Sequence, residues 1–317
     1  MKKNTLEKQI EDLKNEIEEL ENINNDRMID VEIEIKEAKK RLGSLKRMLS
    51  GDLTPWEKVE MARNSKRPTA LDYIELIFDE FIELHGDRTC ADDQAIVCGL
   101  ARIGKQNFTI IAEQKGRTTK ENIKRNFGMP NPESYKKGIR FMKQAEKFNR
   151  PIITFIDTKG AYPGIGAEER GQGEAIARSM FELSNLRTPI IPIIIGEGSS
   201  GGALALGVGD RILMLENAVY SILSPEGYAS ILWKDGSRKE EAAEKMKLTA
   251  QDLYEFKVID EIIKEPLGGA SIENLEEITT DLREKVMNII KELKAKDVET
   301  LVNERYEKFR NMGEYIR

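Results

Sequence analysis

The residues with the clearest chemical potential lie in the stretch Thr188–Asp210, TPIIPIIIGEGSSGGALALGVGD. An apolar run is followed there by glycines and serines, and then by small residues and leucines. This pattern predicts a buried strand, a glycine-rich loop and a closely packed helix. Gly201 and Gly202 would lie at the helix N-terminus, where backbone N–H groups have no intrahelical partner and carry about half a positive charge. Such donors could bind an anion or stabilise an oxyanion. The alternative is a tightly packed helix start with no ligand.

The glycines of this stretch also match a dinucleotide-binding fingerprint. Gly196, Gly198 and Gly201 spell GxGxxG after a strand and before a helix, and Glu216 follows at a distance suited to a ribose contact. A dinucleotide-binding oxidoreductase is therefore an alternative function. Against it, the fingerprint more usually follows the first strand of its domain, whereas this one lies far from either end of the chain.

A third motif, GxSxG at Gly198, Ser200 and Gly202, is typical of the nucleophile elbow of hydrolases. That scheme requires a histidine later in the chain. The only histidine is His85, far upstream. We therefore favour backbone donors, which need no reactive side chain, over a serine nucleophile.

Composition narrows the remaining function classes. The chain has 317 residues, enough for one large domain with appendages, and a formal net charge of −6, which argues against a general nucleic-acid binder. No apolar run approaches the ~18–20 residues that span a bilayer, and the charged start is not that of a signal peptide. Only two cysteines, Cys90 and Cys98, and one histidine argue against a zinc site and indicate a reducing compartment. We expect a cytoplasmic protein with no membrane or specific nucleic-acid partner.

Residues 1–51 are predicted to form a separate antiparallel helical hairpin. Apolar residues recur in steps of four and three in two segments, as in packed helices, and the asparagine-rich segment 22–27 between them suits a turn. Helices this short need a partner surface, which would be the other helix, the main domain or another subunit. The two seams comprise Leu6, Ile10, Leu13, Ile17 and Leu20, and Val31, Ile35, Ala38, Leu42, Leu45 and Leu49.

Two further helices are predicted between residues 53 and 88. Thr54 suits an N-cap, with Pro55 at the first helical position. The second helix is expected over residues 69–88, with apolar residues on one face. His85 would lie at its C-terminal end, where we expect a capping role through the helix dipole rather than a catalytic one.

Strands and helices alternate from residue 94 onward. Two strands are expected at 94–103 and 106–114, around a turn at Gly104 and Lys105. Apolar strands then start after Pro151 and Pro189, and each runs into glycines and a helix. A degenerate third copy follows at 211–235. Repeated strand–strand–helix units with glycine loops predict a mostly parallel α/β spiral rather than a single Rossmann unit.

Two other segments flank these repeats. Residues 115–137 are basic and turn-rich, and Arg117, Lys120 and Lys124 are candidates for phosphate contacts, with a solvated loop as the alternative. After a loop at 268–270 and a long amphipathic helix, residues 296–317 are predicted to form a peripheral helical tail.

Four long segments closely resemble the alpha subunit of the bacterial and plastid acetyl-CoA carboxylase carboxyltransferase. They are QKGRTTKENIKRNFGMPNPESY, FIDTKGAYPGIGAEERGQGEAIA, GEGSSGGALALGVGDRILMLE and SPEGYASILWKD. LTPWEKVEMAR and ELHGDR fit the same family, so the resemblance covers essentially the whole chain. It implies an α/β, crotonase-like (ClpP/crotonase) spiral of repeated ββα units over residues 52–295, between the hairpin and the tail.

The resemblance also implies a reaction and partners. The carboxyl group would pass from carboxybiotin, presented on the biotin carboxyl carrier protein, to acetyl-CoA, giving malonyl-CoA for fatty acid synthesis. The chain would act in an α2β2 heterotetramer with a beta subunit that carries the zinc, alongside biotin carboxylase. It would itself bind no cofactor or metal. No protein acid or base is required, which fits a chain with one histidine.

Carried over by motif, Gly201 and Gly202 would supply the backbone oxyanion hole for the enolate-like oxygen of biotin. The residues that would line the same cleft are Lys159, Gly160, Ala161, Tyr162, Gly164, Gly166, Gly198, Ser199 and Ser200. Lys159 and Ser199 depart from the family pattern, which has proline at the first position and often glycine or alanine at the second. The lysine loosens the loop and adds a cation near the cleft. Two further alternatives are a related biotin-dependent acyl-CoA carboxyltransferase or decarboxylase subunit, and a non-catalytic scaffold.

Overall fold

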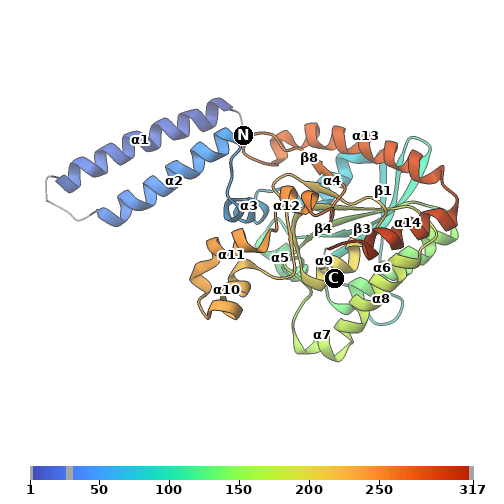
Figure 1. Ribbon diagram of the computed structural model, residues 1–317. Coiled ribbons are helices and arrows are strands. Elements are labelled where there is room, and N and C mark those ends of the chain that lie inside the picture. The colour runs from blue at the N-terminus through green and yellow to red at the C-terminus, as the bar shows by residue number, and fades with distance from the viewer. Residues whose placement is uncertain (1–2, 26–30, 314–317) are drawn as a thin grey trace.

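The computed structural model describes residues 3–25 and 31–313 as a mixed β-sheet covered by helices, with a two-helix hairpin projecting from this body (Figure 1). Within the described residues the sheet has eight strands, in the order β1-β2-β3-β4-β5-β6-β8, and β7 pairs with β5. They are β1 (Glu80–Leu84), β2 (Ile96–Ile103), β3 (Gln106–Glu113), β4 (Ile152–Thr158), β5 (Ile190–Ser199), β6 (Leu213–Leu215), β7 (Val219–Ser221) and β8 (Glu261–Ile263).

The pairing of neighbouring strands changes from antiparallel to parallel at β3, and β2 alone runs opposite to the other strands of this series. The pairs β1–β2 and β2–β3 are antiparallel, whereas β3, β4, β5, β6 and β8 run parallel, as the alternating pattern predicts. Every residue of β4 and β5 is buried, as expected for isoleucine-rich strands covered on both faces. The predicted strands are confirmed, but β5 continues to Ser199. The expected glycine-rich loop is therefore mainly the end of a strand.

Helices cover both faces of the sheet. Helices α6 and α8 pack together on one face, and α4 packs with α13 on the other (Figure 1). The helices of the body are α3 (Pro55–Ala62), α4 (Ala70–Ile77), α5 (Thr119–Lys124), α6 (Pro132–Lys147), α7 (Ile165–Glu169), α8 (Gln172–Asn185), α9 (Ser200–Gly207), α10 (Pro225–Trp233), α11 (Lys239–Met246), α12 (Ala250–Glu255), α13 (Leu275–Lys294) and α14 (Val298–Arg310). Short 3-10 turns occupy Asn126–Gly128, Gly236–Arg238 and Ile272–Asn274. None of the helices described is long and apolar enough to cross a membrane.

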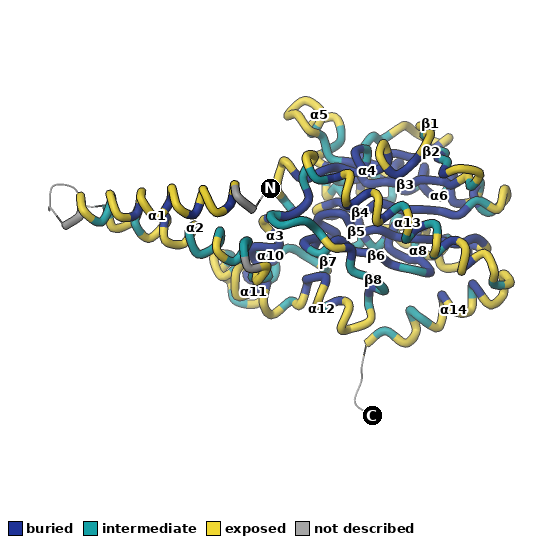
Figure 2. Tube along the Cα trace, turned by 90° about the horizontal axis from the view of Figure 1, so that it is seen from above, coloured by how far each residue is buried: buried dark blue, intermediate teal, exposed yellow. Residues whose placement is uncertain are grey.

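The N-terminal hairpin consists of α1 (Lys3–Asn25) and α2 (Glu32–Ser50), which lie side by side away from the body (Figure 2). Leu13 and Ile17 of α1 pack against Ala38 of α2, so the predicted seam is confirmed. Helix α1 continues through the start of the predicted turn as far as Asn25, and the rest of that turn lies outside the described residues. At the base, Arg47 pairs with Glu57, which also closes the capping box with Thr54 at the predicted start of α3.

The predicted helix over residues 69–88 is wrong in its second half. Helix α4 ends at Ile77, and the chain continues as β1, which pairs antiparallel with β2 at the edge of the sheet. Arg283 of α13 donates to the Ile77 carbonyl at 2.6 Å, and the Asp79 N–H donates to the Arg102 carbonyl at 2.8 Å. Contacts with distant segments thus satisfy the backbone here and override the local helical pattern.

The predicted tail forms a helix over α14, and residues 314–317 lie outside the described residues, but this helix is not merely peripheral. Arg305 of α14 is only 1% exposed and forms a two-bond ion pair with Asp210. Its remaining donors reach the carbonyls of Leu183, Leu186 and Thr188. Helix α14 is therefore anchored to the segments around the start of β5.

Candidate active site

The two predicted glycine segments meet at the carboxyl edge of the parallel strands. Thr158 at the end of β4 pairs with Gly198 near the end of β5, so the loop after β4 lies against the start of α9. A methyl group added at Gly202 would lie 2.4 Å from the Ala161 nitrogen and 2.7 Å from the Gly160 carbonyl carbon. Only glycine permits this approach of the two backbones.

No side chain caps the backbone N–H groups at the start of α9. Ser199 occupies the N-cap position but its side chain accepts no capping hydrogen bond, and Gly201 and Gly202 form the first turn. Ser200 has φ +59°, in the left-handed region that non-glycine residues rarely adopt and that is common at functional sites. Gly202 is buried and Gly201 is half-buried. A helix start without a side-chain cap offers its N–H groups to a ligand.

The loop that faces α9 is held by several hydrogen bonds. The Gly160 N–H donates to Thr158 Oγ1 at 3.0 Å, and the Tyr162 N–H donates to the Pro130 carbonyl at 3.0 Å. Gln172 Nε2 donates to the carbonyls of both Pro130 and Tyr162. A methyl group at Gly164 would lie 2.3 Å from the Tyr162 ring, so this ring packs on its own loop.

The remaining predicted site residues differ in accessibility. Lys159 and Ser200 are exposed, whereas Ala161, Tyr162, Gly164 and Gly166 are half-buried. Gly160 is buried beside Ser199 and Ser200. Gly198 and Ser199 lie inside β5, and Ser199 is only 2% exposed, so they contribute to the strand end rather than to an open loop.

Packing inside the protein explains why Gly196 and Gly198 of the GxGxxG motif are glycines. A methyl group at Gly196 would lie 2.3 Å from Asp157 Oδ1, and one at Gly198 would lie 2.9 Å from the Tyr220 ring. Glu216, the expected ribose contact, is paired with Lys264 at 2.7 Å. The fingerprint lies largely in a buried strand and not in the open turn that a dinucleotide pyrophosphate requires.

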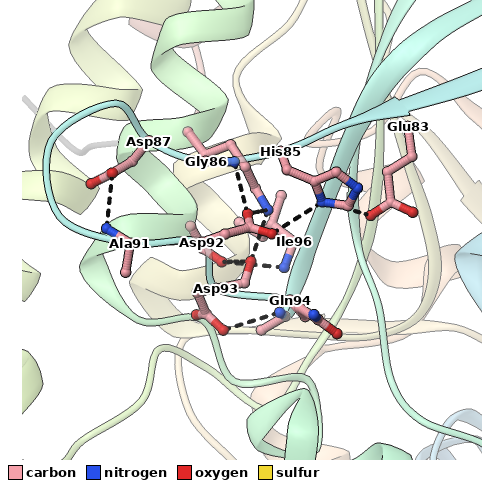
Figure 3. Close-up of polar contacts among 12 residues, drawn as sticks. Glu83, His85, Gly86, Asp87, Ala91, Asp92, Asp93, Gln94 and Ile96 are labelled. Atoms are coloured by element: carbon pink, nitrogen blue, oxygen red, sulfur yellow. Dashed lines mark hydrogen bonds and ion pairs between the residues drawn. The ribbon is translucent and has the colours of Figure 1, made fainter.

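The histidine is remote from Ser200, which excludes the hydrolase elbow. His85 follows β1, which is four strands away from β5 in the sheet. Its Nδ1 lies 3.0 Å from Asp92 Oδ2 and 3.7 Å from Glu83, and Figure 3 shows the ring between these two acids. The predicted capping role is wrong, because His85 follows a strand and not a helix.

The basic segment after β3 is only partly available for a ligand. Arg117 forms an ion pair with Asp72. Lys120 and Lys124 are exposed on α5, which projects from the body (Figure 2), and neither has an ion-pair partner among the described residues. Lys120 and Lys124 therefore remain the freer candidates for phosphate contacts.

Sequence reasoning missed a row of buried acids at the ends of three neighbouring strands. Glu113 ends β3, Asp157 lies near the end of β4, and Glu197 lies near the end of β5. Between Ile156 and Thr158 of β4 the register slips, so that Asp157 faces a bulge in β5 and accepts the Glu197 N–H at 2.9 Å. The Asp157 N–H in turn donates to Glu113 at 2.9 Å. The sequence does contain a signal for this row, because each acid lies at or near the end of an otherwise apolar strand.

Glu113 should make stability depend on pH. Burial raises the pKa of Glu113 well above its usual value, and the neighbouring Asp157 charge adds to the increase. The folded state then binds more protons than the unfolded state above about pH 4.5, so stability falls as pH rises towards the folded pKa. We expect Glu113→Gln to remove a slope of up to about 1.4 kcal/mol per pH unit. Urea unfolding from pH 5 to 8 measures it, with the exposed Glu255→Gln as control. Parallel wild-type and Glu113→Gln curves would contradict the prediction.

The described residues contain no cluster of side chains suited to metal binding. Across residues 3–25 and 31–313, no group of three or more His, Cys, Asp or Glu side chains is arranged to hold a metal ion. The two cysteines are unpaired, with Cys90 exposed and Cys98 buried.

Comparison with known proteins identifies the family. The model of the acetyl co-enzyme A carboxylase carboxyltransferase-like family matches residues 3–313. The acetyl-coenzyme A carboxylase carboxyl transferase subunit alpha of Halalkalibacterium halodurans is 54% identical over 309 residues, covering 98% of this chain and 95% of that protein. The protein of the same name from Clostridium botulinum (strain Alaska E43 / Type E3) is 62% identical over 260 residues, covering 82% and 94%.

A solved structure supports the fold independently. Transcarboxylase 12S, with methylmalonyl-coenzyme A and methylmalonic acid bound, superposes with a TM-score of 0.58 at 17% identity, covering 80% of this chain and 44% of that one. The fold is therefore the crotonase-like α/β fold that the repeats and the resemblance predict. Taken with the family match over nearly the whole chain, this shows that the chain belongs to the family of acetyl-CoA carboxylase carboxyltransferase alpha subunits, which are enzyme subunits of fatty acid synthesis.

Proposed function

We propose that the chain helps to transfer the carboxyl group of carboxybiotin to acetyl-CoA, giving malonyl-CoA, and that Gly201 and Gly202 form the oxyanion hole on the biotin side. The family membership supports the overall reaction. The observation that carries the site is the uncapped start of α9, held by Gly202 against the backbone of Gly160 and Ala161. Donors fixed in this way need not reorient when negative charge develops in the transition state.

The chain's own contribution is electrostatic. Carboxybiotin, when bound, supplies CO2 and then a ureido nitrogen that accepts a proton from the acetyl methyl group. Negative charge develops on the ureido oxygen as the carboxyl group leaves, and the N–H groups of Gly201 and Gly202 would stabilise that charge. The loop from Lys159 to Gly166 would position the ring beside them. Lys120 and Lys124 would contact phosphates of CoA, with Arg117 available only if it leaves Asp72.

We further propose that the site is completed by other chains. The relatives are named as alpha subunits, which implies a complex with a beta subunit. An α2β2 heterotetramer, a zinc site in the beta subunit, and contacts with the biotin carboxyl carrier protein and biotin carboxylase follow from the family resemblance. A cytoplasmic location is a prediction from the sequence.

A mixing assay tests this proposal. Malonyl-CoA-dependent carboxylation of free biotin, the reverse reaction, is measured with this chain alone, the candidate beta subunit alone, and both together. We expect turnover only in the mixture, because neither chain has a complete site. Turnover by this chain alone would contradict the shared site. A stable mixture that uses only another acyl-CoA would change the substrate, and the lack of any complex would overturn the assembly.

A further inference from the structure

The end of β5 is irregular directly before the candidate oxyanion hole. Between the last regular pair, Ile194 with Ile156, and the next pair, Gly198 with Thr158, β5 contains two more residues than β4. These residues form a bulge over residues 195–197, where backbone groups lose their regular strand partners and other groups must satisfy them. Because α9 begins directly after β5, the conformation of this bulge determines where the proposed N–H donors lie.

Two arginines in the turn after α3 hold this bulge. Arg67 Nε donates to the Ile195 carbonyl at 2.7 Å. Arg63 donates to Glu197 Oε1 from Nε at 3.0 Å and from Nη2 at 2.8 Å. The Glu197 N–H in turn donates to Asp157 of β4 at 2.9 Å. Side chains therefore fix the backbone at the point where the regular strand pairing is interrupted.

Arg63 also joins this strand to α10. Its Nη1 donates at 2.7 Å to Glu226 Oε1, in the first turn of α10. The side chains of Arg63 and Glu197 are 26% and 5% exposed, and Glu197 has no other ion pair among the described residues. Without Arg63, the Glu197 carboxylate would either remain buried with no counter-charge, which is costly, or move towards water. Either change disturbs the end of β5.

We propose that Arg63 is a positioning residue of the carboxyltransferase, which fixes the bulge of β5 through Glu197 and thereby aligns the N–H groups of Gly201 and Gly202. The inference rests on the proposed function, because Arg63 acts through the oxyanion hole proposed there. Preorganised donors stabilise developing charge only when they point at it. A displacement of about 1 Å, caused by a change away from the reacting atoms, can cost 100-fold in rate.

The test compares variants of the assembled enzyme in the reverse reaction with free biotin and malonyl-CoA. Arg63→Met removes both ion pairs, whereas Arg63→Lys keeps the charge but lacks the planar group that donates to both acids at once. The matched control is Arg283→Met. Arg283 has a similar exposed fraction, 36%, and pairs with Asp79 beside β1, which is four strands away from β5. The control therefore measures the loss of a comparable ion pair far from the site.

We expect Arg63→Met to lower kcat by about 10- to 100-fold and to change both KM values by less than about threefold. The reason is that misaligned donors weaken the transition state and not the binding of the substrates. Arg63→Lys should lose less kcat but remain below the wild type, and Arg283→Met should keep the wild-type kcat. If Arg63→Met does not assemble, Arg63→Lys tests the same contact. Wild-type kcat in the Arg63 variants, or an equal loss in Arg283→Met, would overturn the inference.

A double-mutant cycle tests the route through Glu197. Arg63→Met and Glu197→Gln disrupt the same contact, so the double variant should lose little more kcat than Arg63→Met alone. Glu226→Gln leaves the contact at the bulge intact and should lose much less kcat than Glu197→Gln. Losses that multiply in the Arg63→Met/Glu197→Gln variant would contradict this route and the inference with it.

A failure of the proposed function gives a different result. In that case the wild-type mixture itself shows no turnover, and amide hydrogen exchange of this chain still tests the positioning role. Arg63→Met should exchange faster than the wild type over residues 195–202 and at the start of α10. Arg283→Met should exchange faster only around β1. Unchanged protection of residues 195–202 in Arg63→Met would show that Arg63 does not hold the end of β5.

Discussion

Gly202→Ala is expected to lower kcat of the assembled carboxyltransferase by at least about 100-fold, the usual effect of losing one oxyanion-hole donor. The added methyl group would lie 2.4 Å from the Ala161 nitrogen and 2.9 Å from the Gly160 Cα. Both neighbours are backbone atoms, so the loop after β4 or the start of α9 must move. Either movement misaligns the two proposed N–H donors, and a displacement of about 1 Å can cost 100-fold in rate. The reverse assay with free biotin measures it.

Two other glycines show whether the effect is local. A methyl group at Gly201 would meet the Ile176 side chain at 3.4 Å, so Gly201→Ala should lose far less activity than Gly202→Ala. Gly138 lies in α6, and its added methyl would make an ordinary contact with Ile111 at 3.5 Å. Gly138→Ala should keep full activity and gain up to about 1 kcal/mol of stability. A Gly202→Ala enzyme that assembles and turns over normally would show that these glycines only pack.

Arg305→Met is expected to lower the free energy of unfolding by about 3–5 kcal/mol, the usual cost of breaking a buried ion pair on one side. Arg305 is 1% exposed, and its guanidinium donates to both oxygens of Asp210 and to three backbone carbonyls. Methionine fills similar volume but leaves the Asp210 charge buried. One Asp210 oxygen still accepts the Ile190 N–H at the start of β5. Urea unfolding of the purified chain measures the loss.

A surface pair of the same helix is the control. Arg187 and Glu299 also join the segment before β5 to α14, at 2.7 Å, but their side chains are 53% and 71% exposed. Arg187→Met should therefore cost less than about 1 kcal/mol. Adding Asp210→Asn to Arg305→Met should recover part of the loss, because no isolated charge then remains. Equal effects of Arg305→Met and Arg187→Met would contradict the buried-pair interpretation.

Local patterns in the sequence predict much of this molecule. The seam of the N-terminal hairpin, the N-cap at Thr54, the strands after Pro151 and Pro189 and the helix at Leu275–Lys294 all follow from periodicity and capping residues. These signals depend only on interactions between residues that are close in sequence, within one or two turns of a helix or within one strand. The long family motifs are likewise visible in the sequence alone, and the family model matches residues 3–313.

Only the tertiary structure decides the contacts between segments far apart in sequence. Residues 80–84 have a helical pattern but form β1, because the edge of β2 is free to pair with them. The acids at the ends of β3, β4 and β5 meet only because parallel strands bring their carboxyl ends together. The Arg305–Asp210 pair and the contact of Gly202 with Gly160 arise likewise from the packing of distant elements. The sequence determines which elements form and which family the chain belongs to. Strand order and register, which no local pattern specifies, determine which side chains become neighbours in the site.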